Sequence, residues 1–432
     1  MNKSSSRMRS RFMRAAALAV SASLVFAFNA PASAKTSLKG EIEFFHWRGE
    51  DVKTFDEIIA GFQKRYPNVK ITQVVTDSAT HQSTALTKIT GNKKIAVYAV
   101  WRDRFASKEY LNAGIMEDLS KEKFLKNFNG PSIATGTIDG KVYAPFYQSL
   151  FNMPLYNTEI FAKEGLTPPR SWPGLLRLCK DLKAKGYVPM AWDGANRPQA
   201  MQMINALLAN AMPNADTSYG ALTASGRVTE PWFFDGVAKK FEEMGKAGCF
   251  PDNALGVTGS AADALFASGK AAIRPTGSFS MGSIKALNPD MAGKMKMMMI
   301  NSQNSSAKAK FQGIHNTQFG LAVNKMSSAN DKKIAKAFIA YLAQPAVAFK
   351  YANGSSQHVT VNKVNYKANK DLDNLAVWLT RKTLLAPRFQ PQGKAIQAGI
   401  AIENMLIQIA SGAKTPAQAA AEYQPIVEQA RQ

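Results

Sequence analysis

The stretch EIEFFHWRGEDVKTFDEIIAGFQKRYPNVKITQVV, residues 41–75, decides the fold. Its start, EIEFFHW, is a largely apolar segment of strand length, and VKITQVV at its end is a second one. Between them Thr54 and Glu57 have the spacing of a capping box, which predicts a helix that starts at Thr54 and stops at Pro67. IAVYAVW (95–101) is apolar on both faces, as in a covered parallel strand. The alternation of strands and helices predicts a parallel α/β sheet.

Trp47 and Trp101 each stand at the carboxyl end of a predicted strand. In open α/β sheets the ligand crevice lies beyond these ends. A single tryptophan there could simply cap the core. Because two of the six tryptophans occupy equivalent places, we expect them to present flat aromatic surfaces at the mouth of a cleft.

The amino terminus has the pattern of an export signal. MNKSSSRMRSRFMR carries five basic and no acidic residues, a short apolar run follows, and APASA places small residues at Ala32 and Ala34. We therefore expect residues 1–34 to be cleaved after Ala34. No cysteine lies near this point, so we expect a soluble periplasmic protein without a lipid anchor.

Length and charge set limits on organisation and partners. Without residues 1–34 the chain would have 398 residues and a net charge of +18, since five of the +23 charges lie in that segment. This length predicts about two domains. The lysines are spread along the chain instead of forming one basic tract, which favours a solvated basic surface over nucleic-acid binding. No later stretch is apolar enough for a membrane span.

Cysteine and histidine are scarce. Cys179 and Cys249 could pair in an oxidising compartment, yet each also lies in a helix-like apolar pattern where a buried free thiol is ordinary. The sequence leaves both alternatives open. The four histidines are scattered, so we expect no metal site, and no cofactor is indicated.

A second α/β region begins near residue 150. RSWPGLLRLCKDLKAKG (170–186) predicts an amphipathic helix that Gly186 ends, with Trp172 in the core, and YVPMAWDG ends a short strand at Trp192 and Asp193. Residues 212–232 are rich in turn formers and predict a surface excursion. The last helix is expected to start at Thr415 and Pro416.

Motifs of phosphate-binding loops, dinucleotide folds, zinc proteases and serine hydrolases are absent. The conspicuous side chains are aromatic and polar: Trp47, Trp101, Asp103, Tyr147, Trp192, Asp193, Trp232 and Trp378. Indole faces pack on sugar C–H groups while carboxylates and amides bond to hydroxyls, so this set suits carbohydrate binding. A polyamine could use the same groups, but less well in a basic chain.

Several ordered motifs resemble one family. They are FHWRGEDVKTFDEIIAGFQKRYPNVKI (45–71), a stretch from Thr135 to Trp192 with GKVYAP, YN and GLTPPRSW, ALFASGKAAIRPTGSFSMGSI (264–284) and SGAKTPAQAAAEYQPIVEQ (411–429). The sequence resembles the extracellular solute-binding proteins of bacterial ABC importers, of the sugar-binding type related to maltose-binding protein. Phe279 replaces the family's tryptophan, and Lys93 and Lys94 replace its usual Pro-Asp-Val.

The resemblance implies a two-lobed type II fold that closes over solute. The amino-terminal lobe would take 35–146 and 301–352, and the carboxyl-terminal lobe 147–300 and 353–432. The implied ligand contacts come from strand ends, the hinge and facing turns: His46, Trp47, Arg48, Trp101, Asp103, Tyr147, Gln148, Trp192, Asp193, Trp232, Gly277, Ser278, Phe279, Asn316, Thr317 and Gln318.

The leading hypothesis is a monomeric, non-enzymatic binding protein that delivers a mono- or oligosaccharide to the transmembrane subunits of an ABC permease. The basic surplus and Arg48 leave room for an acidic solute instead. A secreted carbohydrate-active enzyme is the third possibility, with Asp103 and Asp193 as its carboxylate pair.

Overall fold

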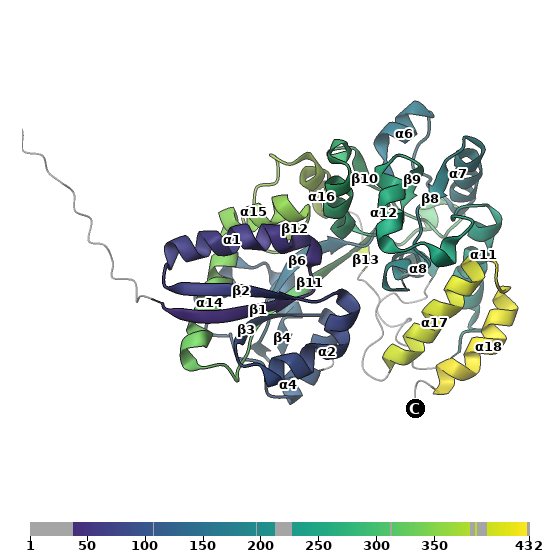
Figure 1. Ribbon diagram of the computed structural model, residues 1–432. Helices are drawn as coiled ribbons and strands as arrows, with labels where there is room; N and C mark the ends of the chain where they lie inside the picture. Colours follow the sequence, from purple (N-terminus) through teal and green to yellow (C-terminus); the bar gives the residue numbers. More distant parts are fainter. Residues whose placement is uncertain are drawn as a thin grey trace, which may run out of the picture. The chain divides into compact units, whose positions relative to one another are not determined.

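The computed structural model of the protein describes residues 38–106, 108–195, 197–211, 227–311, 313–380, 385–386 and 395–429 (Figure 1). Within these ranges no helix is long and apolar enough to cross a membrane. Of the turn-rich segment expected at the surface, residues 212–226 lie outside the described part.

A large mixed sheet is built around residues 41–75. Its strands run in the order β12, β6, β11, β3, β1, β2, with β13 also paired to β11. β1 is parallel to both β2 and β3, whereas β11 is antiparallel to β3 and β6. The expected parallel α/β sheet is thus confirmed, with antiparallel strands added on one side. The bounds are β1 Gly40–His46, β2 Val69–Val75, β3 Ile95–Val100, β6 Phe146–Phe151, β11 Gly313–Val323, β12 His358–Val359 and β13 Leu385–Ala386.

Helices cover both faces of this sheet (Figure 1). Phe44 packs in one core with residues of α1 (Val52–Arg65) and α14 (Ala329–Leu342), while its neighbour Phe45 packs in another with residues of α2 (Ser78–Gly91) and α4 (Glu109–Asn112). All six residues of β3 are buried, as the two-sided apolar pattern predicted.

The expected capping box at the start of α1 is wrong. The helix starts at Val52, with Asp51 at its N-cap, so Thr54 already lies in the first turn. Thr54 instead packs against Gly354 of α15 (Pro345–Ser355), where an added Cβ would lie 2.4 Å from the Thr54 hydroxyl. The helix ends at Arg65, just before Pro67, as expected.

A second, smaller sheet has the strand order β10, β7, β9, β8. These strands are β7 Leu155–Asn157, β8 Val188–Met190, β9 Ala271–Arg274 and β10 Met295–Met297. The predicted amphipathic helix is α7 (Trp172–Ala184), whose N-cap hydroxyl, Ser171 Oγ, accepts from the Gly174 N–H. Trp172 is buried as expected.

The structure settles the alternatives that the sequence left open for the two cysteines. Cys179 on α7 and Cys249 form a disulfide between positions 70 residues apart in sequence. The backbone oxygen of Cys249 also accepts from the Met190 N–H at the end of β8 (2.9 Å). At the carboxyl terminus, α18 (Pro416–Gln429) starts at the expected proline, and Thr415 Oγ1 accepts from the Gln418 N–H (3.3 Å).

Candidate functional site

The two tryptophans at the strand ends lie face to face. The rings of Trp47 and Trp101 stack with centroids 4.2 Å apart and planes 16° apart. Trp47 is 5% exposed because Phe319 and His81 also contact its ring, whereas Trp101 is half-buried. The pair therefore forms one aromatic block, and Trp101 is the member with surface left for a ligand.

Arg48 follows Trp47 and is held by two carboxylates. Its guanidinium lies 2.8 Å from Asp51 and 2.8 Å from Glu50, in the short helix η1 (Gly49–Asp51). The Tyr351 hydroxyl donates to Asp51 (2.6 Å), and Gln148 donates to that hydroxyl. Arg48 is thus neutralised inside the protein, which removes the argument for an acidic solute.

His46 is hydrogen-bonded within the protein and has no charge to offer a ligand. One ring nitrogen lies 2.8 Å from the Gln73 amide oxygen, and the other accepts from the Arg48 N–H (3.1 Å). Burial lowers the pKa of His46 to about 4, so the imidazole is neutral near pH 7.

A second group of charged side chains lies at the ends of strands of the smaller sheet. Asp193 follows β8 and makes two hydrogen bonds with Arg274 at the end of β9 (2.9 and 3.3 Å). The same guanidinium donates to Asp263 on α12 (Gly259–Ala267; 2.8 Å), whose other oxygen accepts from Ser283 (2.6 Å). Burial raises the pKa of Asp193, and Arg274 opposes that shift. This fully engaged ion pair gives Asp193 a structural role, in contrast to the free carboxylate that a glycosidase needs.

The turn Gly277–Phe279 reaches the hinge strand β6. Ser278 Oγ accepts from the Phe151 N–H (3.2 Å). A Cβ at Gly277 would lie 2.7 Å from the Phe151 oxygen, so this close approach requires glycine. The contact brings Phe279 next to the large sheet.

A crevice of ≈ 290 Å³ lies between these two sets of elements, close to the lower limit of ordinary ligand pockets. Glu50 lines it from the large sheet's side, while Asp263, Arg274 and Phe279 line it from the other. Hydroxyl groups complete the lining: Thr258, Ser260, Ser280 and Ser283. Burial raises the pKa of Glu50, and Arg48 opposes that shift. The crevice therefore offers carboxylates, hydroxyls and one aromatic ring, while its arginine is already paired.

The hinge residues divide into two groups. Gln318 on β11 accepts from the Arg102 N–H beside Trp101 (2.9 Å), and Asn316 is buried two residues earlier. Thr317 donates to Thr135 (2.9 Å), and Tyr147 donates to the Leu342 oxygen (3.1 Å). Thr317 and Tyr147 thus tie the sheet to neighbouring helices.

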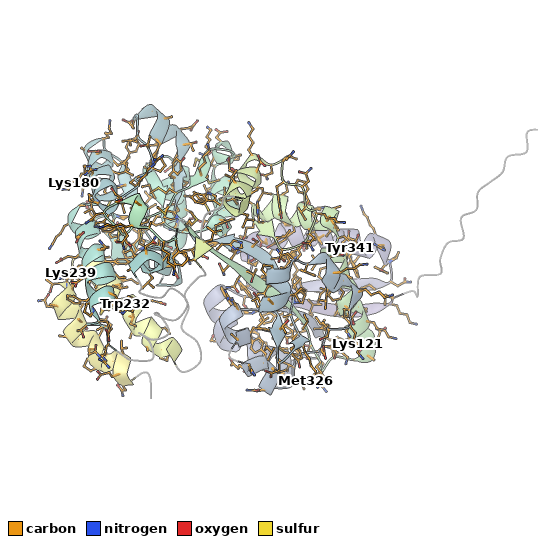
Figure 2. The ribbon with its side chains drawn as sticks, turned by 180° about the vertical axis from the view of Figure 1, so that it is seen from behind. Lys121, Lys180, Trp232, Lys239, Met326 and Tyr341 are labelled. Carbon is orange, nitrogen blue, oxygen red and sulfur yellow. A yellow bond between two sulfur atoms is a disulfide. The ribbon has the colours of Figure 1, made fainter. Side chains whose placement is uncertain are left out.

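Two expected contacts, Trp192 and Trp232, are not brought to this crevice, and a third, Asp103, is not placed. Trp192 is buried in the core of the smaller sheet against Phe250. Trp232, on α10 (Pro231–Phe233), packs half-buried on the same core (Figure 2). Asp103 lies in α3 (Arg102–Ala106), and its side chain is outside the described part of the structure.

Sequence reasoning missed the charged residues that build the crevice. Glu50 and Asp51 directly follow the strand end, and Arg274 is a charged residue in the otherwise apolar β9. A charge in a buried strand was the available signal, because such a charge needs a partner. Among the described residues, no group of three or more His, Cys, Asp or Glu side chains could hold a metal ion.

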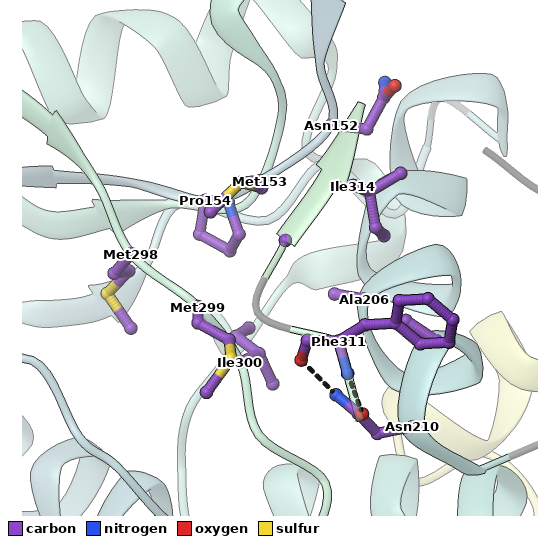
Figure 3. A pocket seen from close by; sticks show the side chains of 12 residues that line it. Asn152, Met153, Pro154, Ala206, Asn210, Met298, Met299, Ile300, Phe311 and Ile314 are labelled. Atoms are coloured by element: carbon purple, nitrogen blue, oxygen red, sulfur yellow. Dashed lines mark hydrogen bonds between the residues drawn. The ribbon is translucent and has the colours of Figure 1, made fainter. Parts of the chain in front are cut away.

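A second hollow, between β11 and α8 (Arg197–Ala211), is far smaller (Figure 3). Its volume is ≈ 10 Å³, room for about one water molecule. The Asn210 amide bonds to both backbone groups of Phe311 at its edge (2.9 Å each). It cannot take a sugar.

The family model described as bacterial extracellular solute-binding protein matches residues 47–349. The chain belongs to this family. This solute-binding protein is 22% identical over 346 residues to the multiple sugar-binding protein of Streptococcus mutans, covering 78% of this chain and 79% of that relative.

Solved structures confirm the fold of this solute-binding protein as the expected two-lobed type II α/β fold. RafE in complex with raffinose matches with a TM-score of 0.77 and 20% identity, covering 91% of this chain and all of that one. A chitin oligosaccharide binding protein matches with a TM-score of 0.76 and 18% identity, covering 90% and 99%. Family and relatives are binding proteins rather than enzymes.

The stability of the crevice wall should depend on Arg274. We expect Arg274→Met to lower the free energy of unfolding by about 3 kcal/mol, because Asp193 and Asp263 would stay buried without their cation. Urea unfolding at pH 7 measures the loss. Arg177→Met, at an exposed position of α7, is the matched control. Equal stability of the two variants would show that the ion pair does not hold this wall.

Proposed function

We propose that this solute-binding protein captures a carbohydrate in the crevice between its lobes and delivers it to the transmembrane subunits of an ABC importer. The observation that carries the proposal is the crevice lining. It combines an aromatic ring with carboxylate and hydroxyl groups, and its own arginine, Arg274, is already paired, as is Arg48, which contacts Glu50. Sugar hydroxyls bond to such groups, while a sugar's C–H face packs on Phe279.

The relatives support the same solute class. One relative is named a multiple sugar-binding protein, one solved neighbour is in complex with raffinose, and another is a chitin oligosaccharide binding protein. An acidic solute is less favoured, because the positive surplus lies on dispersed exposed lysines such as Lys121, Lys180 and Lys239 (Figure 2) rather than in the crevice.

The remaining parts of the proposal concern organisation. We propose that residues 1–34 direct export to the periplasm and are removed, and that the mature protein acts as a monomer without a lipid anchor. Its lobes comprise 35–146 with 301–352, and 147–300 with 353–432. Its candidate ligand contacts are Glu50, Asp263 and Phe279, which line the crevice. Trp101 and the buried amides of β11, Asn316 and Gln318, are further candidates.

Calorimetric titration of the mature protein tests the proposal. The probes are raffinose, maltose and chitotriose as neutral sugars, galacturonate as an acid and spermidine as a cation. Binding of a neutral sugar without any product detectable by mass spectrometry is the expected result. Binding of galacturonate or spermidine alone would overturn the carbohydrate proposal.

Trp101 should contribute to affinity. We expect Trp101→Ala to weaken binding of the sugar found in that titration by about ten- to a hundredfold, since one aromatic stacking contact and its N–H are lost. Tyr66→Ala, which removes a half-buried ring at the far end of α1, is the control. An affinity loss in the control but not in Trp101→Ala would place the ligand elsewhere.

A further inference from the structure

Gln357 is a fully buried amide whose polar atoms have no partner among the described residues. It lies directly before β12, and neither its Oε1 nor its Nε2 makes a hydrogen bond to any of the described residues. A buried unpaired amide costs free energy, and most buried polar groups in folded proteins are paired. Asn324, equally buried, shows the ordinary case: it donates to the Ile89 and Ile95 oxygens and accepts from the Met326 N–H.

The strand register places Gln357 on the face of the hinge strands that carries other amides. His358 pairs with Ser149, so Gln357 falls opposite Leu150, which on its other side pairs with Asn316. Two residues along these strands, Gln148 pairs with Gln318. Alternate residues of a strand share a face, so the amides at 148, 316, 318 and 357 lie on one face. The Gln148 amide also donates to Tyr351 of the Arg48 network.

Other polar atoms on these elements are unpartnered as well. They are Trp101 Nε1, Asn316 Oδ1 and Gln318 Nε2, all buried, and Ser356 Oγ next to Gln357. Gln318 is bonded to the Arg102 N–H, which fixes it beside Trp101. Asn316 and Gln357 are two strands apart, about 10 Å. The atoms thus form a patch of a width that a small saccharide can span.

The patch is balanced between donors and acceptors. The Trp101, Gln318 and Gln357 nitrogens donate, and the Asn316 and Gln357 oxygens accept. An anion would satisfy only donors and a cation only acceptors, whereas a hydroxyl both donates and accepts. We propose that Gln357 is a ligand-binding residue, and that its amide, with those of Asn316 and Gln318, orients the hydroxyls of an uncharged sugar. This inference rests on the proposed function of the same protein.

A binding amide and a structural amide respond differently to replacement. Gln357→Met keeps the side-chain length and removes only atoms that have no partner in the fold. We therefore expect unchanged or higher resistance to urea, because no bond is lost, together with about tenfold or greater weakening of sugar binding. Asn324→Leu, the matched control, should do the reverse: lower stability with unchanged affinity.

The test uses calorimetry with raffinose, maltose and chitotriose on the mature wild type and both variants, with urea unfolding in parallel. Weakened binding in Gln357→Met at full stability supports the inference. Unchanged affinity in Gln357→Met, with the wild type binding, overturns the role of Gln357 and leaves the proposed function standing. Absence of binding by the wild type to every probe overturns both. Tighter binding of galacturonate than of any neutral sugar overturns the uncharged class alone.

Discussion

Acidification from pH 7 to pH 5 is expected to lower the free energy of unfolding by up to about 2 kcal/mol for each of four histidines. Burial lowers the pKa of His46, His81, His315 and His358 from 6.5 to about 4. The unfolded chain takes up these protons near pH 6.5, while the native state resists protonation until about pH 4. Their contribution to stability is therefore complete above pH 6.5 and falls as the pH drops through this window.

The raised pKa values of Glu50 and Asp193 act in the opposite direction and offset part of the loss. Urea unfolding at pH 7, 6 and 5 measures the slope of the free energy of unfolding against pH. His358→Gln is the control, since glutamine can still donate to the Leu372 oxygen that His358 contacts (2.6 Å). That variant should take up about one proton fewer on unfolding near pH 5. A slope equal to that of the wild type would contradict the prediction.

Loss of the disulfide should be the most damaging single change at neutral pH. Replacing Cys179 and Cys249 together by alanine is expected to lower the free energy of unfolding by about 4 kcal/mol, because the bond closes a loop of 70 residues in the unfolded chain. This corresponds to a fall in melting temperature of roughly 5 °C. Thermal unfolding followed by circular dichroism measures it.

Reducing the wild-type protein separates the contribution of the disulfide bond to stability from the contribution of side-chain packing. The reduced protein keeps both buried sulfur atoms, so its decrease in the free energy of unfolding measures the effect of the cross-link alone. Any further decrease in the alanine variant measures the effect of the missing side-chain volume. A reductant should not shift the alanine variant at all. If reduction leaves the wild type unchanged as well, the disulfide contributes nothing to stability.

Local pattern was enough to predict the elements but not their partners. The two-sided burial of β3, the end of α1 before Pro67 and the amphipathic helix α7 depend on neighbours within a few residues, and the structure confirms them. The capping box failed because Asp51, not Thr54, precedes the helix. Asp51 is held there by Arg48 and by Tyr351, which is 300 residues away in sequence.

The candidate site shows the same limit. Arg48 read alone left room for an acidic solute, and Asp193 read alone left open a catalytic carboxylate. Each is neutralised by side chains that only the folded chain brings near: Arg48 by Glu50 and Asp51, Asp193 by Arg274, 81 residues on. Trp47 and Trp101 were placed at the correct strand ends, but their stacking on one another depends on strand register, which no pattern gave.

That stacked pair also gives the protein a built-in optical reporter. Two indoles with centroids 4.2 Å apart are close enough for their electronic transitions to couple, and we expect paired bands of opposite sign in the circular dichroism spectrum. A ligand that contacts Trp101 and tilts its ring would change those bands without any label. Replacing either tryptophan by phenylalanine would abolish the signal, so the spectrum can follow solute capture in real time.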